Sequence, residues 1–466
     1  MLHVSLLTKI QKAKMKPNIV KTYPFTRECP LPSHKVGCTE SCNLSVVTLE
    51  AVETPKYWSL SRKNVIFVVD ISGSMLYTLP SIKASIKTFR DLMCGRERSS
   101  QPPVTDESFR ELVPNFHLIT FSDKARLCWS NSTRRGDSDG SLKGFDDLVA
   151  SLEVEGSTNM GEGIELAYSL CPQGGSSIIQ GPDARASWIV VLTDGVSNLG
   201  KYQTADAFHS LSKRKPSNSK IISLGYGTEF DMETLDKLGD FTYLEDEESI
   251  PRFMGALTHE ISTCRIMNVR IGFPQREGTD PKDIVFGSPN IGWFGNERKY
   301  HFGFIGRWGA SPRHYETGEV IHIHYTEIEE AGIWHFQTSE RVSNPVGEPE
   351  QIPVYIRTEI VATKASKLIK ELYKCGNFTC KSAIARTLAI VEKWTAEGEE
   401  EPRETVKRVC FQLQKSLDSG NQTFTPKSVQ ISNALVAQTS YTDPIYQTPS
   451  SKAATQKALD LSKTYL

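Results

Sequence analysis

The chain has 466 residues, with 54 lysines and arginines against 55 aspartates and glutamates. This length allows roughly two to four domains, and the balanced charge creates no overall field that would recruit nucleic acid or an anionic membrane. The apolar run in residues 1–7 is too short for a signal peptide or an anchor, and no other stretch is long enough to span a bilayer. We therefore expect a cytoplasmic protein with no membrane span and no nucleic-acid partner.

Residues 1–42 have no sustained hydrophobic period and are interrupted by basic residues and prolines, so we expect an N-terminal extension there. Cys29, His34, Cys38 and Cys42 lie within it, at intervals from which thiolates and an imidazole can close a tetrahedral zinc site. A second CxxC-like pair is missing, which favours unrelated thiols in an arm over a zinc site.

Residues 43–61 are expected to supply one or two strands, because apolar residues such as Leu44, Val46 and Leu49 predominate in their first half. A lone strand cannot satisfy its own edges. It must therefore pair with residues distant in sequence, and the β-rich region after residue 263 is the candidate.

The chain is organised around residues 64–75, where an unbroken apolar run, Val65–Val69, is followed by Asp70, Ser72 and Ser74. Such a run, rich in β-branched residues, is typical of a strand buried on both faces of a parallel sheet. Asp70 alone would be interpreted as a helix cap. Because ligands bind at the carboxyl ends of strands in open α/β sheets, the three oxygen-bearing side chains together indicate a site.

Two further segments offer oxygen ligands at the ends of predicted elements. Gly156–Gly161 contains Thr158 and precedes a helical pattern, and the apolar strand Trp188–Thr193 ends at Asp194. A mixture of carboxylate and hydroxyl oxygens suits a hard octahedral cation that keeps part of its water, namely Mg²⁺ or Mn²⁺.

In this order the three motifs resemble the von Willebrand factor A domain, whose metal-ion-dependent adhesion site has an Asp-x-Ser-x-Ser sequence, then a threonine, then an aspartate. The resemblance implies that the metal ligands are Asp70, Ser72, Ser74, Thr158 and Asp194. The segment from Gly239 to Asp246, with the apolar residues after it, is similar to the A domains of inter-α-trypsin-inhibitor heavy chains and of plant proteins that join the domain to a RING finger. A C3HC4 RING pattern is absent from the sequence, which argues against a ubiquitin ligase.

Between residues 62 and 263 strand and helix patterns alternate, which predicts an α/β fold with a doubly wound, mostly parallel sheet. Besides the two strands already named, strands are expected at Phe116–Phe121, Ala125–Trp129, Ile221–Gly227 and Phe241–Tyr243. Helices are expected after Ser74, at Gly144–Leu152 and Gly161–Leu170, after Asp231 and at Ser249–Ile261. These residues would form the A domain.

From residue 264 to residue 362 the pattern changes to the alternation of an antiparallel β-sandwich. Its strands are expected at Ile266–Ile271, Asp283–Phe286, Lys299–Ile305, Val320–Tyr325, Ile333–Phe336 and Val354–Val361. With residues 43–61 supplying the first strand or two, the A domain (62–263) would be inserted in the sandwich, as the family resemblance also suggests. Residues 363–437 predict a small helical region, and residues 438–466 a disordered tail with a short helix near 453–463.

The charge of the predicted site suggests its function. Two carboxylates only offset the two positive charges of the cation, and hydroxyls and water fill most of the remaining coordination. If one carboxylate binds through water, as the family resemblance implies, the metal exchanges a water for a partner's carboxylate. We therefore predict a non-enzymatic, Mg²⁺-dependent protein-binding module whose protein partner offers an Asp or Glu.

Two alternatives remain open. An aspartyl-phosphate phosphotransferase would need a second carboxylate where the chain has Ser72, and an acyl hydrolase would need a Gly-x-Ser-x-Gly elbow and a histidine, so a metal-dependent hydrolase is disfavoured. A structural component of a large assembly, in which the metal staples the loops, is not distinguished by sequence from the binding module.

Overall fold

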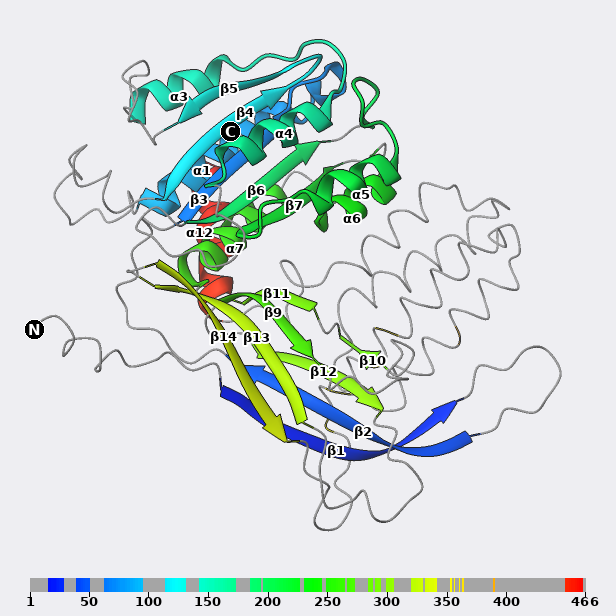
Figure 1. Ribbon diagram of the computed structural model, residues 1–466. Coiled ribbons are helices and arrows are strands. Elements are labelled where there is room, and N and C mark those ends of the chain that lie inside the picture. The colour runs from blue at the N-terminus through cyan, green and yellow to red at the C-terminus, as the bar shows by residue number, and fades with distance from the viewer. Residues whose placement is uncertain are drawn as a thin grey trace, which may run out of the picture. The chain divides into compact units, whose positions relative to one another are not determined.

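The chain divides into two compact units in the computed structural model (Figure 1). Unit 1 comprises Met1–Trp58, Cys264–Tyr325 and Phe336–Pro353, and unit 2 comprises Ser59–Thr263, Thr326–His335 and Val354–Leu466. The structure describes residues 16–28, 39–50, 63–94, 114–130, 142–172, 185–193, 196–226, 230–244, 249–264, 266–272, 284–287, 290–294, 299–305, 320–329, 332–341 and 449–463, with single positions 353, 356, 360, 363 and 389. Among these residues no helix has the length and apolar character needed to cross a membrane.

Unit 2 is built on a six-stranded sheet with the order β5-β4-β3-β6-β7-β8. Its strands are β3 (Lys63–Asp70), β4 (Asn115–Phe121), β5 (Ala125–Ser130), β6 (Ala186–Thr193), β7 (Ser219–Tyr226) and β8 (Asp240–Leu244). All neighbours are parallel except β4 and β5. Every residue of β3 and β6 is buried, so the predicted α/β fold with its mostly parallel sheet is confirmed.

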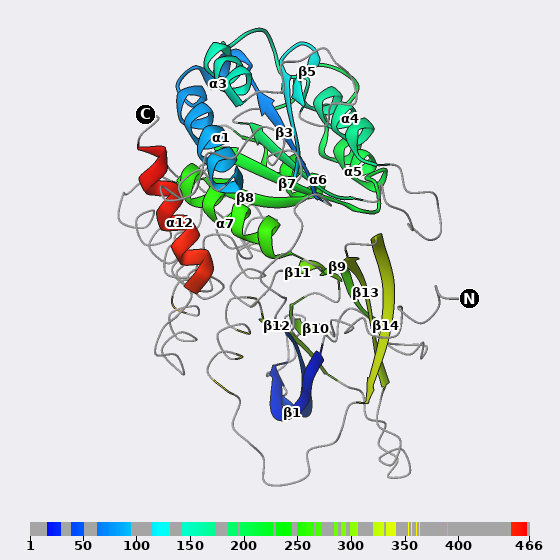
Figure 2. The ribbon, with the colours of Figure 1, turned by 90° about the vertical axis from the view of Figure 1, so that its left-hand side faces the viewer.

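Helices cover both faces of this sheet (Figures 1 and 2). They are α1 (Leu79–Cys94), α3 (Leu142–Ser151), α4 (Met160–Leu170), α5 (Ala205–Lys213), α6 (Met232–Leu238) and α7 (Ser249–Thr263). On one face Ile164, Phe208 and Leu235, from α4, α5 and α6, share a buried core with Ile66 and Val68 of β3. Ile66 and Val68, two residues apart in β3, therefore point to the same face of the sheet, as the pleat of a strand requires.

The other face of the sheet is held by aromatic side chains. Phe67 of β3 packs edge-on against Phe89 of α1, with ring centroids 5.0 Å apart. Phe145 of α3 meets Phe116 of β4 at 5.3 Å and Trp129 of β5 at 4.9 Å. All five rings are buried, and rings of this size bury enough apolar surface to fix α1 and α3 on the sheet.

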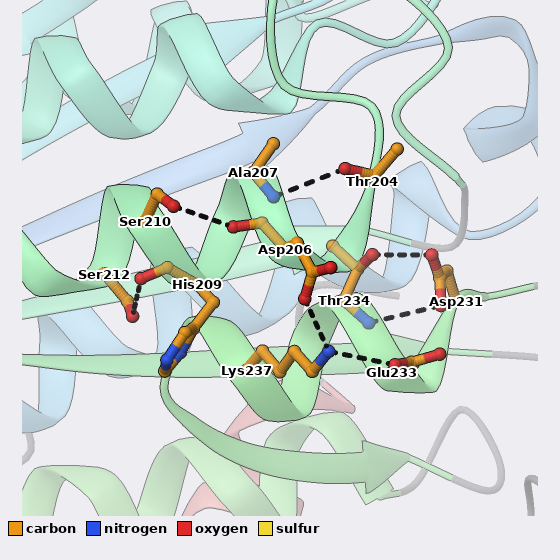
Figure 3. Close-up of polar contacts among 10 residues, drawn as sticks. All are labelled: Thr204, Asp206, Ala207, His209, Ser210, Ser212, Asp231, Glu233, Thr234 and Lys237. Carbon is orange, nitrogen blue, oxygen red and sulfur yellow. Dashed lines mark hydrogen bonds and ion pairs between the residues drawn. The ribbon is translucent and has the colours of Figure 1, made fainter.

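Capping side chains fix the ends of α5 and α6 (Figure 3). Thr204 precedes α5 and accepts a hydrogen bond from the backbone N–H of Ala207 at 3.3 Å, and Asp231 caps α6 in the same way through the N–H of Thr234 at 3.2 Å. The ammonium of Lys237 on α6 lies 3.1 Å from the carboxylate of Asp206 on α5. These contacts orient α5, a helix that was not predicted from the sequence.

The remaining strands form two four-stranded sheets, β1-β2-β12-β10 and β11-β9-β13-β14. They are β1 (Lys16–Glu28), β2 (Thr39–Glu50), β9 (Ile266–Gly272), β10 (Ile284–Phe286), β11 (Asn290–Phe294), β12 (Lys299–Ile305), β13 (Val320–Glu329) and β14 (Gly332–Arg341). Val47 and Phe302 of the first sheet share one buried core with Val269 and Ile323 of the second. Two sheets that face each other across such a core form a sandwich.

Strand β2 confirms that residues 43–50 contribute a strand that pairs beyond residue 263. Leu49 lies opposite Tyr300 and Val47 opposite Phe302 in the antiparallel ladder between β2 and β12. Strands that precede and follow the α/β sheet in the sequence therefore belong to one sheet.

Strand β1 corrects the expectation that residues 1–42 form only an extension. It pairs antiparallel with β2, with a register shift between Pro17 and Val20. β1 is the edge strand of its sheet, and an edge tolerates prolines such as Pro17 and Pro24 because one side of the strand needs no N–H donors. Those prolines concealed the strand in the sequence pattern.

The predicted strand Val354–Val361 is wrong at its two described helical positions, Ile356 and Ile360. Both are buried, and residues four apart share one face of a helix, so the same apolar spacing fits both periods. Other predictions fall on residues outside the described ones: nearly all of the helical region 363–437, and Cys29, His34 and Cys38 of the zinc candidate.

Helix α12 (Pro449–Ser462) lies within the segment expected to be a disordered tail. The short helix predicted near residues 453–463 is confirmed, and disorder does not apply to it because α12 packs against α7 and α1 (Figure 2). A glycine makes this close approach possible. A Cβ at Gly255 of α7 would lie 2.5 Å from the carbonyl oxygen of Ala454 and 2.7 Å from the Cα of Thr455.

We expect Gly255→Ala to loosen α12, because the atoms that the new methyl group meets belong to the backbone and cannot rotate away. Overpacking of this kind costs about 1–3 kcal/mol, while the higher helix propensity of alanine returns about 1 kcal/mol. Limited proteolysis within residues 449–462 is therefore the sensitive measurement, and cleavage should become faster. Gly272→Ala is the control, because its methyl group meets nothing closer than 3.5 Å. Equal cleavage rates in both variants would contradict the prediction.

Candidate functional site

Asp70 is the last residue of β3, and its side chain is fully buried. Its Oδ1 accepts a hydrogen bond from the backbone N–H of Ser72 at 2.8 Å. Its Oδ2 accepts one from the hydroxyl of Thr193, the last residue of β6, at 2.6 Å. The carboxylate is thus oriented from two sides, by the turn that follows its own strand and by the end of the neighbouring strand.

The hydroxyl oxygens of Ser72 and Ser74 lie 3.1 Å apart just beyond Asp70. Ser74 belongs to a short 3₁₀ helix, Gly73–Leu76, which is anchored by the fully buried side chain of Met75. Oxygen ligands about 2.1 Å from an octahedral Mg²⁺ have neighbours about 3 Å away. The two hydroxyls therefore have the spacing of two adjacent ligands of such an ion.

The loop before α4 is bonded to the turn after β3. The N–H of Glu155 donates to the carbonyl of Ile71 at 2.6 Å, and the N–H of Gly73 donates to the carbonyl of Gly156 at 3.3 Å. Gly156 has φ +64°, and a Cβ there would lie 2.7 Å from Oδ1 of Asp123, so both its conformation and its surroundings require glycine. These bonds hold two of the predicted ligand loops side by side.

Thr158 joins this loop to the segment that follows β6. Its carbonyl accepts hydrogen bonds from the N–H groups of Asn198 at 3.0 Å and Leu199 at 3.1 Å. Its own N–H donates to Oδ1 of Asn198 at 2.9 Å, and the hydroxyl of Ser197 reaches the same carbonyl at 3.3 Å. Thr158 is buried within this network, with 4 % of its surface exposed.

Asp194 lies outside the described residues, so the structure describes four of the five predicted ligands. Asp70, Ser72 and Ser74 are joined by direct hydrogen bonds, and Thr158 is joined to them through the bonded loops. Asp194 itself is the next residue in the chain after Thr193.

Two residues that hold the predicted ligands were missed by the sequence reasoning. Thr193 was recognised only as the end of a strand, although its place directly before Asp194 was a signal. Asn198 gave no signal, because its partner Thr158 is 40 residues away.

Glu165 of α4 anchors the segment between β6 and α5. Its Oε1 accepts a hydrogen bond from the hydroxyl of Tyr202 at 2.7 Å, and it pairs with the ammonium of Lys201 and the guanidinium of Arg214, each at 2.8 Å. Burial would raise the pKa of Glu165, but the bonds from these three groups outweigh it and lower the pKa to about 2. Two cations and one carboxylate leave one net positive charge in this cluster.

The described residues contain no group of three or more His, Cys, Asp and Glu side chains arranged to hold a metal ion. The predicted site has a different composition, because its described members are one carboxylate and three hydroxyl-bearing residues. With Asp194 the predicted set has two carboxylates, which only offset the two positive charges of a divalent cation.

The class of protein follows from this arrangement, an α/β domain with loops gathered at the carboxyl ends of its parallel strands. Residues 64–253 match the family model of the von Willebrand factor type A domain. The chain therefore contains a domain of this family.

Particular relatives fit the same class. The chain is 22% identical to inter-alpha-trypsin inhibitor heavy chain H2 of Mus musculus over an alignment of 292 residues, which covers 60% of this chain and 28% of that protein. It is 28% identical over 171 residues to the protein YfbK of Escherichia coli, covering 36% of this chain and 25% of that protein. The chain thus covers only about a quarter of the length of either relative.

A solved structure shows the same fold. The von Willebrand factor type A protein from Catenulispora acidiphila superposes with a TM-score of 0.51 and 16% identity, covering 84% of this chain and 92% of that one. At this identity the likeness concerns the fold alone.

The bond between Thr193 and Asp70 predicts a specific loss of stability. Thr193→Val keeps the shape of the side chain but removes a donor to a buried carboxylate, so the free energy of unfolding should fall by about 1–3 kcal/mol. Urea denaturation measures this value. Thr193→Ser restores the hydroxyl and should recover most of the loss. A valine variant as stable as the wild type would contradict the importance of this bond.

The depressed pKa of Glu165 predicts how stability depends on pH. Because the folded pKa is about 2 and lies below the value of an unfolded chain, about 4.3, the stabilisation is complete above about pH 4.3 and is lost as the pH falls toward 2. Glu165→Gln should therefore be less stable than the wild type at neutral pH, with a difference that shrinks on acidification. Melting temperatures across this range measure it.

Glu233→Gln is the matched control for this experiment, because it removes an exposed ion pair with Lys237 within one helix. Its difference from the wild type should be small throughout. Parallel pH profiles for the wild type and Glu165→Gln would refute the assignment.

Proposed function

We propose that this protein is a Mg²⁺-dependent protein-binding module, with Mn²⁺ able to replace Mg²⁺, and not an enzyme. The ion would be held by Asp70, Ser72, Ser74, Thr158 and Asp194, and an Asp or Glu of a protein partner would complete its coordination. The observation that carries this proposal is the pair of serine hydroxyls, 3.1 Å apart, beside the buried carboxylate. Domains of the matched family commonly mediate interactions between proteins.

The chemistry of the donors fits the proposed ion. Mg²⁺ and Mn²⁺ are hard cations that bind oxygen, and each proposed ligand offers a carboxylate or a hydroxyl oxygen. When bound, the ion supplies positive charge and an exchangeable coordination position that favours a carboxylate.

The protein's own residues prepare the site. Asp70 is oriented by the amide of Ser72 and the hydroxyl of Thr193, and Thr158 is fixed by its bonds to Asn198. Groups that are already positioned lose little conformational freedom when a ligand binds. This order supports binding without a large rearrangement of the loops.

The surroundings of Ser72 favour binding over hydrolysis. A nucleophilic serine needs an adjacent base to remove its proton, and the hydroxyl of Ser72 instead contacts the hydroxyl of Ser74. The residue two positions after Asp70, where a phosphotransferase would have its acid, is this same serine.

Titration with Mn²⁺, followed by electron paramagnetic resonance, tests the site without knowledge of the partner. The wild type should bind the ion, and Asp70→Asn and Ser74→Ala should each weaken binding by about tenfold or more, as the loss of a ligand or its support does. Thr158→Ser keeps a hydroxyl and should bind nearly as well as the wild type. Ser210→Ala is the control, because its hydroxyl donates to the carbonyl of Asp206 within α5 and Ser210 is not one of the proposed ligands. Circular dichroism verifies the fold of each variant.

Partner binding is tested by pull-down with the full chain, with Mg²⁺ or with EDTA. Proteins retained with Mg²⁺ should be lost with EDTA and with Asp70→Asn, but retained by Ser210→Ala. Binding that survives both treatments would refute the proposal. If removal of the metal lowers the melting temperature but leaves partner binding unchanged, the structural role is favoured instead.

A further inference from the structure

Exposed apolar side chains occur on two of the segments that form the proposed metal site. Among the described residues, five large apolar side chains are exposed: Leu76, Tyr77, Leu127, Val196 and Leu199. Leu76 and Tyr77 come two and three residues after Ser74, and Val196 and Leu199 lie in the segment after Asp194. Four of the five therefore adjoin the site, and we call these four the apolar rim.

The side chains of the apolar rim are exposed, but the backbone that carries them is held by hydrogen bonds and by buried neighbours. Next to Leu76 and Tyr77, which are 54% and 85% exposed, Met75 is fully buried, and its carbonyl accepts the N–H of Thr78 at 3.0 Å. The turn is therefore fixed with these two side chains directed outward.

The second half of the rim is held in a similar way. Ser197, between Val196 and Leu199, is buried, and its hydroxyl donates to the carbonyl of Tyr202 at 2.9 Å. The N–H of Leu199 donates to the carbonyl of Thr158. Apolar side chains held outward on ordered loops mark an interaction surface more often than single exposed residues do.

The charge beside the rim indicates the kind of partner. Lys201 follows the rim by two residues, and its side chain is 64% exposed. Lys201 and Arg214 carry two positive charges against the one negative charge of Glu165, with which both pair. The carboxylate of Asp70 is buried. On the side of Lys201 the surface beside the rim is therefore apolar and locally cationic, whereas the exposed Asp123 and Glu155 lie on the side of the Gly156 loop. The Lys201 side complements a carboxylate with apolar neighbours.

We infer that Leu76, Tyr77, Val196 and Leu199 form a docking surface for an exposed segment of a partner protein in which an Asp or Glu is flanked by apolar side chains. The inference rests on the proposed function, because the same carboxylate would reach the metal. The apolar flanks would select among the many acidic segments that metal coordination alone would accept. Large apolar and aromatic anchors usually dominate the energy of such contacts.

Two display libraries of short peptides provide the test. One library has a fixed central Asp and the other a fixed central Asn, and each is selected for binding to the full chain in the presence of Mg²⁺. The Asp library should yield peptides with apolar residues beside the Asp. These peptides should bind Tyr77→Ser and Leu199→Ser about tenfold more weakly than the wild type, as truncation of an anchor does. Leu127→Ser is the matched control, because Leu127 is 42% exposed but pairs with Ile119 within the β4–β5 ladder, and it should bind as the wild type does.

Each result separates the inference from the proposed function. Selected peptides that need Asp, Mg²⁺ and Asp70 but have no apolar preference, or that bind the rim variants unchanged, would overturn the inference and leave the proposed function standing. Apolar peptides from both libraries that bind equally in EDTA would support the rim and refute the metal-dependent function. Failure of both libraries would overturn the inference, while the Mn²⁺ titration still decides the metal site.

A second copy of the chain is the other possible occupant of the rim. Sedimentation velocity measures it, and the wild type should sediment as Tyr77→Ser does. A wild-type dimer that Tyr77→Ser dissociates and Leu127→Ser does not would overturn the assignment to a partner segment.

Discussion

The buried carboxylate of Asp70 is the constraint on which the rest of this site depends. A carboxylate removed from water is unstable unless donors or a cation surround it. Here the donors come from the amide of Ser72 and the hydroxyl of Thr193, so one charge fixes both the turn after β3 and the end of β6. The parallel register of the two strands, with Val69 opposite Leu192, makes this possible because it brings their last residues to the same level.

Backbone hydrogen bonds extend that order outward through the loops. The turn at Gly73 is bonded to the loop at Gly156, and Thr158 in that loop is bonded to Asn198 and Leu199 beyond β6. The Glu165 cluster then fixes the same segment to α4. Three loops that are far apart in sequence are thus connected by hydrogen bonds at the carboxyl ends of the strands.

Most of the α/β domain could be predicted because its signals are local. The strand β3 is a continuous apolar run, and α1 has a clear helical period. Helix α5 was missed because its buried face consists of only Phe208 and Leu211. Edge strand β1 was concealed by its prolines, and the spacing of Ile356 and Ile360 fits a strand as well as a helix. In each of these cases the pairing or packing partner, which the sequence does not contain, decided the structure.

The site divides in the same way between local and distant signals. Asp70, Ser72 and Ser74 occupy one short stretch and could be recognised together, whereas Thr193 lies 123 residues from the Asp70 that it bonds. Leu76 and Tyr77 show a further limit of prediction from sequence, because apolar residues close to a core residue are ordinarily predicted to be buried as well. Only the structure shows that Met75 is buried while the two residues after it are exposed. The same short 3₁₀ helix and its C-cap residue, Tyr77, therefore position the hydroxyl of Ser74 and two exposed apolar side chains, which links the polar and apolar parts of this surface through a single turn.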